Sequence, residues 1–209
     1  MTTVLDAATL RRTCRRTGRV LEGVGAGQLE APTPCAEWTV REVMAHLVAA
    51  ADFFADVAEL GESPEGRPWP EYRADELATA FSRQAGRLVA AFEREGAMAR
   101  PMRLPTGAAT GRLAVQVATA EVFVHGFDVA AATGQGFGDD ALAEALLCSD
   151  YVALCAEVRH DPTRPFAAEV LLARPAGATD RLVAFLGRDP GASGPTVSQA
   201  TGSSGPPAP

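Results

Sequence analysis

A long apolar stretch in the middle of this sequence must be buried in any fold that the chain adopts. Residues 113–132 read LAVQVATAEVFVHGFDVAAA, with few polar positions among them. A helix that is apolar on most sides belongs in a protein core or in a membrane. Glu121, His125 and Asp128 argue against a membrane span, because each is costly to place in lipid. We therefore expect a core helix in a protein that has no membrane partner.

Two polar residues within this stretch share one face of the expected helix. Glu121 and His125 are four residues apart, which is about one helical turn. His46 interrupts a second apolar helical run, residues 43–58. Burying polar groups without partners costs several kcal/mol, so these residues need a structural or chemical reason to be there. Together they could supply three ligands to one metal ion and leave a fourth position open.

The chemistry of these residues points to a divalent metal. Imidazole and carboxylate are common ligands of Zn²⁺, and three protein ligands with one open position are typical of catalytic zinc. Asp128 lies three residues after His125, where it could orient that ligand. The plainer interpretations stay open: His46 as a hydrogen-bonded core histidine, Glu121 as the partner of an arginine, and Asp128 as a surface hydrogen-bonding group.

Helical patterns and helix-end signals cover most of the remaining chain. Thr39 and Glu42 form a capping box that opens a helix ending at Gly61. We predict further helices from Asp6 to about residue 25, over about 74–95, from Asp139 or Asp140 to about 159, and over 180–186. Residues 98–111 are expected to form a loop. The sequence therefore predicts an all-α protein built on a four-helix bundle, with additional short C-terminal helices.

Composition limits the class of protein. The chain has 209 residues, a net charge of −7 and a pI near 5.0. This size suits one domain, and the acidic balance argues against a nucleic-acid partner. We assign residues 1–189 to the bundle and expect a disordered tail over 190–209, where Gly, Pro and Ser are frequent.

The four cysteines show no CxxC spacing, and the N-terminus does not resemble a signal peptide. We therefore expect reduced thiols in a cytoplasmic protein. Cys35 lies just before the second helix, whose dipole could lower the pKa of a thiol, although a small buried apolar role is the simpler interpretation.

Three segments then occur in an order that resembles a known family. Residues 33–46 (TPCAEWTVREVMAH), 121–135 (EVFVHGFDVAAATGQ) and 181–190 (RLVAFLGRDP) are similar to signatures of the DinB-like superfamily. The similarity is strongest to the actinobacterial branch that includes mycothiol-dependent maleylpyruvate isomerase. This resemblance implies a DinB-type four-helix bundle and a divalent metal, usually zinc, held by His46, Glu121 and His125.

The resemblance also carries expectations about function. It implies an enzyme that uses the low-molecular-weight thiol mycothiol for isomerisation or S-transfer on a small electrophilic substrate. Two alternatives stay open: a metal-dependent natural-product enzyme that uses no thiol, and a non-catalytic bundle that binds metal or a small molecule. DinB-like bundles often dimerise, so a homodimer is a further expectation.

Overall fold

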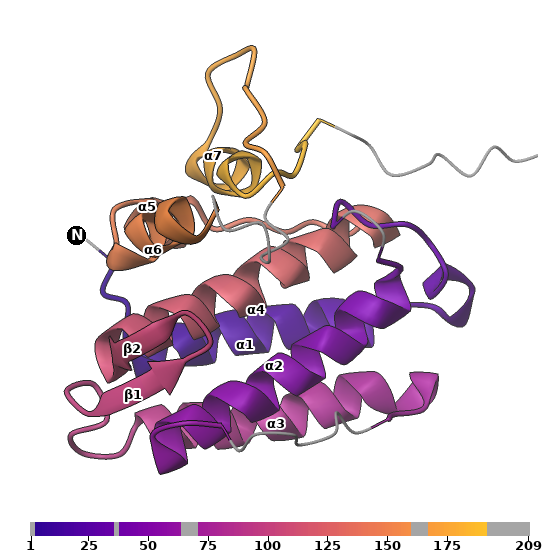
Figure 1. The fold of residues 1–209 in the computed structure, drawn as a ribbon. Helices are drawn as coiled ribbons and strands as arrows, with labels where there is room; N and C mark the ends of the chain where they lie inside the picture. Colours follow the sequence, from indigo (N-terminus) through magenta and orange to yellow (C-terminus); the bar gives the residue numbers. More distant parts are fainter. Residues whose placement is uncertain (1–2, 36–37, 64–70, 160–166, 192–209) are drawn as a thin grey trace, which may run out of the picture.

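Four long helices form the body of the protein in a computed structural model (Figure 1). The structure describes residues 3–35, 38–63, 71–159 and 167–191. The helices of the bundle are α1 (Ala7–Glu22), α2 (Val40–Leu60), α3 (Leu77–Phe92) and α4 (Gly111–Thr133). Both α1 and α2 pack against α3 and α4. The predicted all-α bundle is confirmed.

Helix-end signals in the sequence fix where these helices begin and end. Asp6 accepts a hydrogen bond from the Thr9 amide at 2.9 Å at the start of α1. At the start of α2, the Thr39 amide donates to Glu42 Oε2 at 2.7 Å, and the Thr39 side chain accepts from the Glu42 amide. Gly61 ends α2 with a positive φ of 96°, a conformation that glycine adopts without strain. These three predictions are confirmed.

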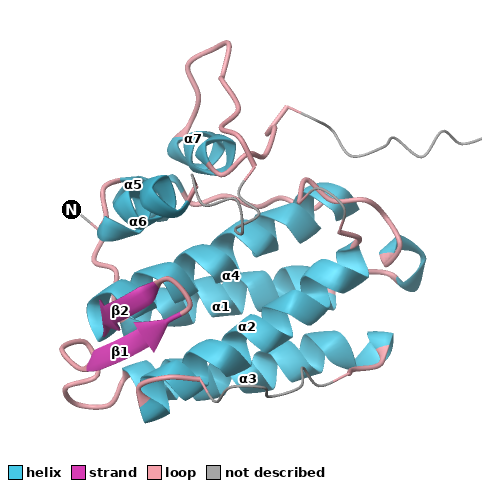
Figure 2. Ribbon diagram, viewed as in Figure 1, coloured by secondary structure: helices cyan, strands magenta, loops and turns pink. Residues whose placement is uncertain are grey.

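The C-terminal part of the chain forms a second layer over α4. It contains α5 (Asp140–Leu147), α6 (Asp150–Val158) and α7 (Ala178–Phe185), which lie on one side of the bundle in Figure 2. Val122 of α4 packs in the bundle core, whereas the neighbouring Phe123 packs in a separate cluster with Leu146 and Leu182. Because both sides of α4 are covered, this helix is apolar around its circumference.

Among the described helices, α4 is the one whose length and hydropathy would suffice to cross a membrane. Within its most apolar window, 78% of the residues are buried inside the protein. This burial is typical of the core helix of a bundle, in agreement with the interpretation of the sequence.

Two details differ from the sequence-based prediction. The expected loop 98–111 contains an antiparallel hairpin, β1 (Pro101–Leu104) with β2 (Gly107–Thr110). Its strands have four residues each, too few for a clear alternating pattern, although Met102 and Leu104 do point into the core.

The predicted fifth helix is divided into α5 and α6. The division follows Cys148, where the Ser149 side chain accepts a hydrogen bond from the Tyr151 amide and starts a new helix. Helix α6 therefore runs in its own direction beside α4, which it contacts. Residues 192–209, most of the predicted tail, lie outside the described part of the chain, so the domain boundary stays a prediction.

Candidate metal centre

Helices α2 and α4 bring the three predicted ligands together. Glu121 Oε2 lies 3.3 Å from His46 Nε2 and 3.4 Å from His125 Nε2. The ligand atoms of the three residues all lie within 4.8 Å of one another. Two ligands placed at zinc-bond lengths in a tetrahedral site are roughly 3.3 Å apart. The spacing of these donors therefore fits a small tetrahedral ion.

Trp38 covers both imidazoles. Its ring centroid lies 4.7 Å from that of His46 and 5.8 Å from that of His125. The loop before α2 holds the tryptophan in place, because the Thr33 hydroxyl donates to the Trp38 carbonyl at 2.9 Å. The indole ring thus limits how far either histidine can turn. No role at the site was predicted for Trp38 from the sequence, although its place in the segment 33–46 was a signal.

Asp128 and Arg188 support His125 from behind. His125 Nδ1 lies 3.0 Å from Asp128 Oδ2, and Asp128 is fully buried. Arg188 donates to both Asp128 oxygens, at 3.3 and 3.0 Å, and to the Leu186 carbonyl at 2.9 Å. An Nδ1–H bond to Asp128 leaves Nε2 of His125 as the atom that faces Glu121.

The sequence predicted that Asp128 could orient a ligand, and its position here is the one this role requires. The contribution of Arg188 was missed. The only sequence signal for Arg188 was its place in the C-terminal motif, residues 181–190. That motif does not indicate a contact with Asp128, which is 60 positions away.

The charges of the group are strongly coupled. Burial raises the pKa of Glu121, but hydrogen bonds and charge from His125 and His46 outweigh it and hold that pKa well below its usual range. Burial lowers the pKa of His125, but Asp128 and Glu121 outweigh it and raise the pKa to about 9. Without a metal, the group is therefore an ionised carboxylate beside a protonated imidazole, and a bound cation would take the place of that proton.

Comparison with known proteins places the chain in a family. Residues 10–130, more than half of the chain, match the model of the mycothiol maleylpyruvate isomerase N-terminal domain. The chain belongs to this family. The match covers α1 to α4 almost completely and includes all three candidate ligands. It confirms the resemblance to the isomerase branch of the DinB-like superfamily.

The chain is also similar to individual proteins and to solved structures. Uncharacterised proteins from two strains of Mycobacterium tuberculosis are each 34% identical over 170 residues, which is 81% of this chain and 90% of theirs. Two solved structures of mycothiol-dependent maleylpyruvate isomerase, one of them a mutant, superpose with TM-scores of 0.54 and 0.52 at 17% and 16% identity.

These superpositions cover 66% of this chain and 65% of each isomerase chain. This chain thus matches slightly less than two thirds of the solved isomerase. At this identity the likeness establishes the shared fold.

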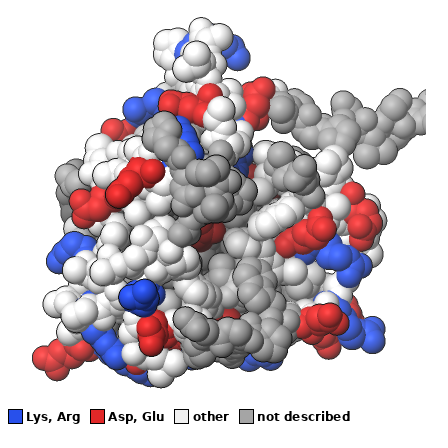
Figure 3. Space-filling view, in the orientation of Figure 1, with Lys and Arg blue, Asp and Glu red and all other residues white. Residues whose placement is uncertain are grey.

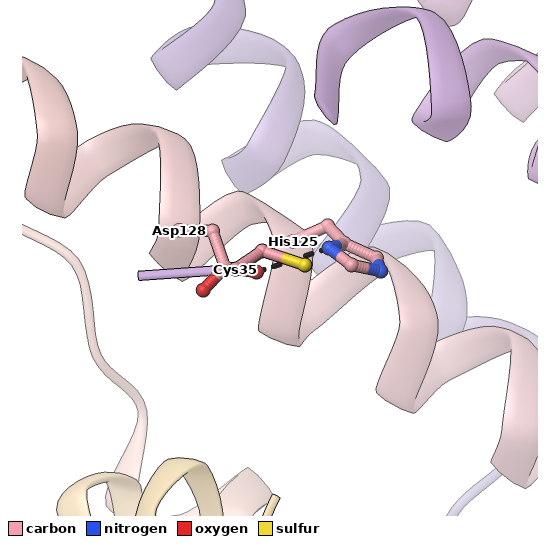
Figure 4. A group of neighbouring side chains, drawn as sticks. All are labelled: Cys35, His125 and Asp128. Atoms are coloured by element: carbon pink, nitrogen blue, oxygen red, sulfur yellow. Dashed lines mark hydrogen bonds and ion pairs between the residues drawn. The ribbon is translucent and has the colours of Figure 1, made fainter. Parts of the chain in front are cut away.

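A second group of potential ligands lies behind His125 in this family member. Cys35, His125 and Asp128 also have ligand atoms within 4.8 Å of one another (Figure 4). Burial raises the pKa of Cys35 to about 11, against a smaller lowering by Arg188, so the thiol is neutral at pH 7. Both Asp128 oxygens are engaged by Arg188. His46, Glu121 and His125 therefore form the better metal-binding group, and the helix dipole does not activate Cys35.

A cavity opens beside this group. His46 and Glu121 form part of the wall of a cavity of about 430 Å³. Its volume falls in the range of small-molecule sites. Two of the three candidate ligands, His46 and Glu121, therefore border a space in which a small molecule could lie.

Proposed function

We propose that this chain is a zinc-dependent enzyme that uses a low-molecular-weight thiol, mycothiol, to isomerise or to S-conjugate a small electrophile. The observation that carries the proposal is the spacing of Nε2 of both histidines around Glu121 Oε2, at 3.3 and 3.4 Å, with His46 and Glu121 on the wall of a cavity. Membership of the mycothiol maleylpyruvate isomerase family supports the choice of thiol and of reaction class.

The donor set suits a metal that activates a thiol. Two neutral imidazoles and one carboxylate would leave a bound zinc ion with a net positive charge, and such an ion would favour the thiolate form of a bound thiol at neutral pH. The residues of the chain do the remaining work. Asp128 fixes the ring of His125 through Nδ1, and Trp38 shields both imidazoles on another side.

The reaction then follows from the chemistry of a thiolate. It adds to an electrophilic carbon of a conjugated double bond, and the electron pair of that bond moves to the conjugated carbonyl oxygen. Rotation can then occur about the carbon–carbon bond that has become single. When the electron pair returns from the oxygen, the double bond re-forms and the C–S bond breaks, which releases the thiolate and gives the isomer. If the substrate carries a leaving group, that group can depart with the electron pair in place of the thiolate. The C–S bond is then kept, and the product is an S-conjugate.

Metal analysis followed by calorimetry tests this proposal. We expect about one zinc per chain, and mycothiol binding that needs zinc. S-methyl mycothiol is the matched control, since it has no thiol proton to lose and should bind at least about tenfold more weakly. Zinc without any preference for the free thiol would favour a metal enzyme that uses no thiol, or a non-catalytic metal-binding bundle. Absence of zinc from protein purified under metal-replete conditions would refute the metal centre itself.

The remaining expectations stay predictions. They are a cytoplasmic location, a homodimer, and the absence of nucleic-acid and membrane partners. On the face that Figure 3 shows, arginines are interspersed with acidic residues over the described part of the surface.

A further inference from the structure

The cavity beside the candidate centre is formed by four elements of the chain. Helix α2 and helix α4 contribute the ligands His46 and Glu121, helix α6 contributes Tyr151 and Cys155, and the turn between β1 and β2 contributes Thr106. The hairpin and the division between α5 and α6, both absent from the sequence-based prediction, therefore shape this space.

The wall of the cavity is mainly hydrocarbon. Apolar side chains line it from every one of these elements: Phe53, Phe54, Leu104, Val117, Leu154 and Val158. Neither arginine nor lysine occurs among the described residues that line it. Tyr151 and Cys155 could ionise, but burial raises the pKa of both groups, which keeps them neutral at pH 7.

Arg188 lies near the candidate ligands, but its guanidinium already makes hydrogen bonds outside the cavity. Arg188 donates to both oxygens of Asp128 and to the Leu186 carbonyl, and it does not line the cavity. A carboxylate inside the cavity would lose its hydration without gaining a guanidinium from these residues. Such a transfer is costly, whereas the burial of an apolar group is favourable.

We propose that this cavity selects an electrophile with an apolar, uncharged body, whose reacting carbon lies toward His46 and Glu121. That the substrate is an electrophile rests on the proposed function. That it is apolar and uncharged rests on the cavity alone. It separates this chain from any enzyme of the same fold whose substrate is a dicarboxylate, because such a substrate needs cationic partners along its length.

Two unreactive ketones test the preference. 4-Phenyl-2-butanone and 4-(3-oxobutyl)benzoate differ by one ring carboxylate, and neither reacts with thiols. Calorimetry on the zinc-loaded full chain, without added thiol, should show at least about tenfold tighter binding of the uncharged ketone. Ala50→Leu adds bulk to the wall and should weaken that binding about tenfold or more while zinc content stays unchanged.

A charge introduced at the turn provides the converse test. Thr106 is exposed and lines the cavity, so Thr106→Arg should tighten binding of the carboxylated ketone at least about tenfold. Ala108→Arg is the matched control, because Ala108 is exposed on the same hairpin and does not line the cavity.

Equal affinities for the two ketones would overturn the inference. So would uncharged-ketone binding that Ala50→Leu leaves unchanged, or the absence of such binding. Zinc and mycothiol binding are measured separately, so a failure here is distinguishable from a failure of the proposed function.

Discussion

Helix α2 carries two clusters of buried polar residues, and they differ in where their positive charge comes from. Near the end of the helix, Asp52, Asp56 and Glu59 converge on one arginine of α3, Arg87, with donor–acceptor distances of 2.8, 2.6 and 3.2 Å. Near its start, His46 meets Glu121 and His125 of α4. The first cluster has a permanent guanidinium from the chain, whereas the second has imidazoles that hold either a proton or a metal.

Because of this difference, the first cluster suits helix packing and the second suits metal binding. A guanidinium keeps its charge at every physiological pH, so the cluster around Arg87 can only stabilise the packing of α2 on α3. An imidazole can give up its proton when a metal binds, so the cluster around Glu121 can accept a cation from solution. A cluster of carboxylates is therefore a candidate metal site when its positive partners are imidazoles, which can exchange a proton for a metal ion.

Removal of a ligand should have the largest effect on metal binding. We expect His125→Ala to lower zinc affinity by more than about 100-fold, because the loss of a direct ligand exceeds the 10–100-fold effect of losing a supporting residue. Competition with a chromophoric chelator measures this change. Unfolding by denaturant should stay cooperative, and unchanged zinc affinity in this variant would remove His125 from the site.

Removal of the guanidinium should show the opposite pattern. Arg87→Ala leaves three carboxylates without their shared partner, and we expect a loss of about 2–4 kcal/mol in the free energy of unfolding, since Arg87 is partly exposed. Zinc affinity should change less than about threefold, because no ligand is touched. The exposed Arg83 on the same helix offers a control, Arg83→Ala, with an effect within about 0.5 kcal/mol. A large loss of zinc from Arg87→Ala would contradict the separation of the two clusters.

The support behind His125 should matter less than the ligand itself. Asp128→Asn weakens the acceptor for Nδ1 and should lower zinc affinity about 10- to 100-fold. Arg188→Ala should act in the same direction with a smaller effect, because Asp128 keeps its bond to His125. Chelator competition on both variants, with melting temperature as the folding control, checks the order. An Arg188→Ala effect larger than that of Asp128→Asn would show that the arginine acts by another route.

The pH dependence follows from the raised pKa of His125, about 9 in the metal-free protein. The proton on this ring stabilises the metal-free fold below about pH 6.5, and that contribution is lost as pH rises toward 9. Zinc must displace the proton, so its affinity should rise up to about tenfold per pH unit between pH 6.5 and 9. Calorimetry in buffers of different ionisation enthalpy would detect the released proton. A flat profile over this range would contradict the coupling.

The smallest effect is expected at the thiol behind the site. Cys35→Ala should change zinc affinity less than about twofold, because a neutral thiol with a pKa of about 11 is a poor ligand. The same chelator competition measures it. A tenfold loss would instead assign the metal to Cys35, His125 and Asp128.

Local signals made much of the fold predictable. The capping box at Thr39 and Glu42, the cap at Asp6 and the stop at Gly61 each involve residues within a few positions of one another. The same is true of Glu121 and His125, whose spacing predicts a shared face. His46 was added because polar residues are rare in apolar helices, and the fold brought it to 3.3 Å from Glu121.

Features that depend on distant contacts were not predictable in this way. The hairpin strands are too short for a periodic signal, and Leu104 reaches the cavity only through the tertiary fold. The bond between Arg188 and Asp128 joins residues 60 positions apart, so no spacing rule could indicate it. The cavity is lined in part by α6, which the sequence-based prediction had merged with α5 into a single helix.

The place of Arg188 in the chain has a consequence for biosynthesis. His46, Glu121, His125 and Asp128 all leave the ribosome before Arg188, so the bundle can form while its last supporting side chain is still missing. During that interval, the buried charge of Asp128 has only His125 to neutralise it. Completion of the centre thus waits for the docking of the segment that follows α7, which couples maturation of the site to the folding of that segment.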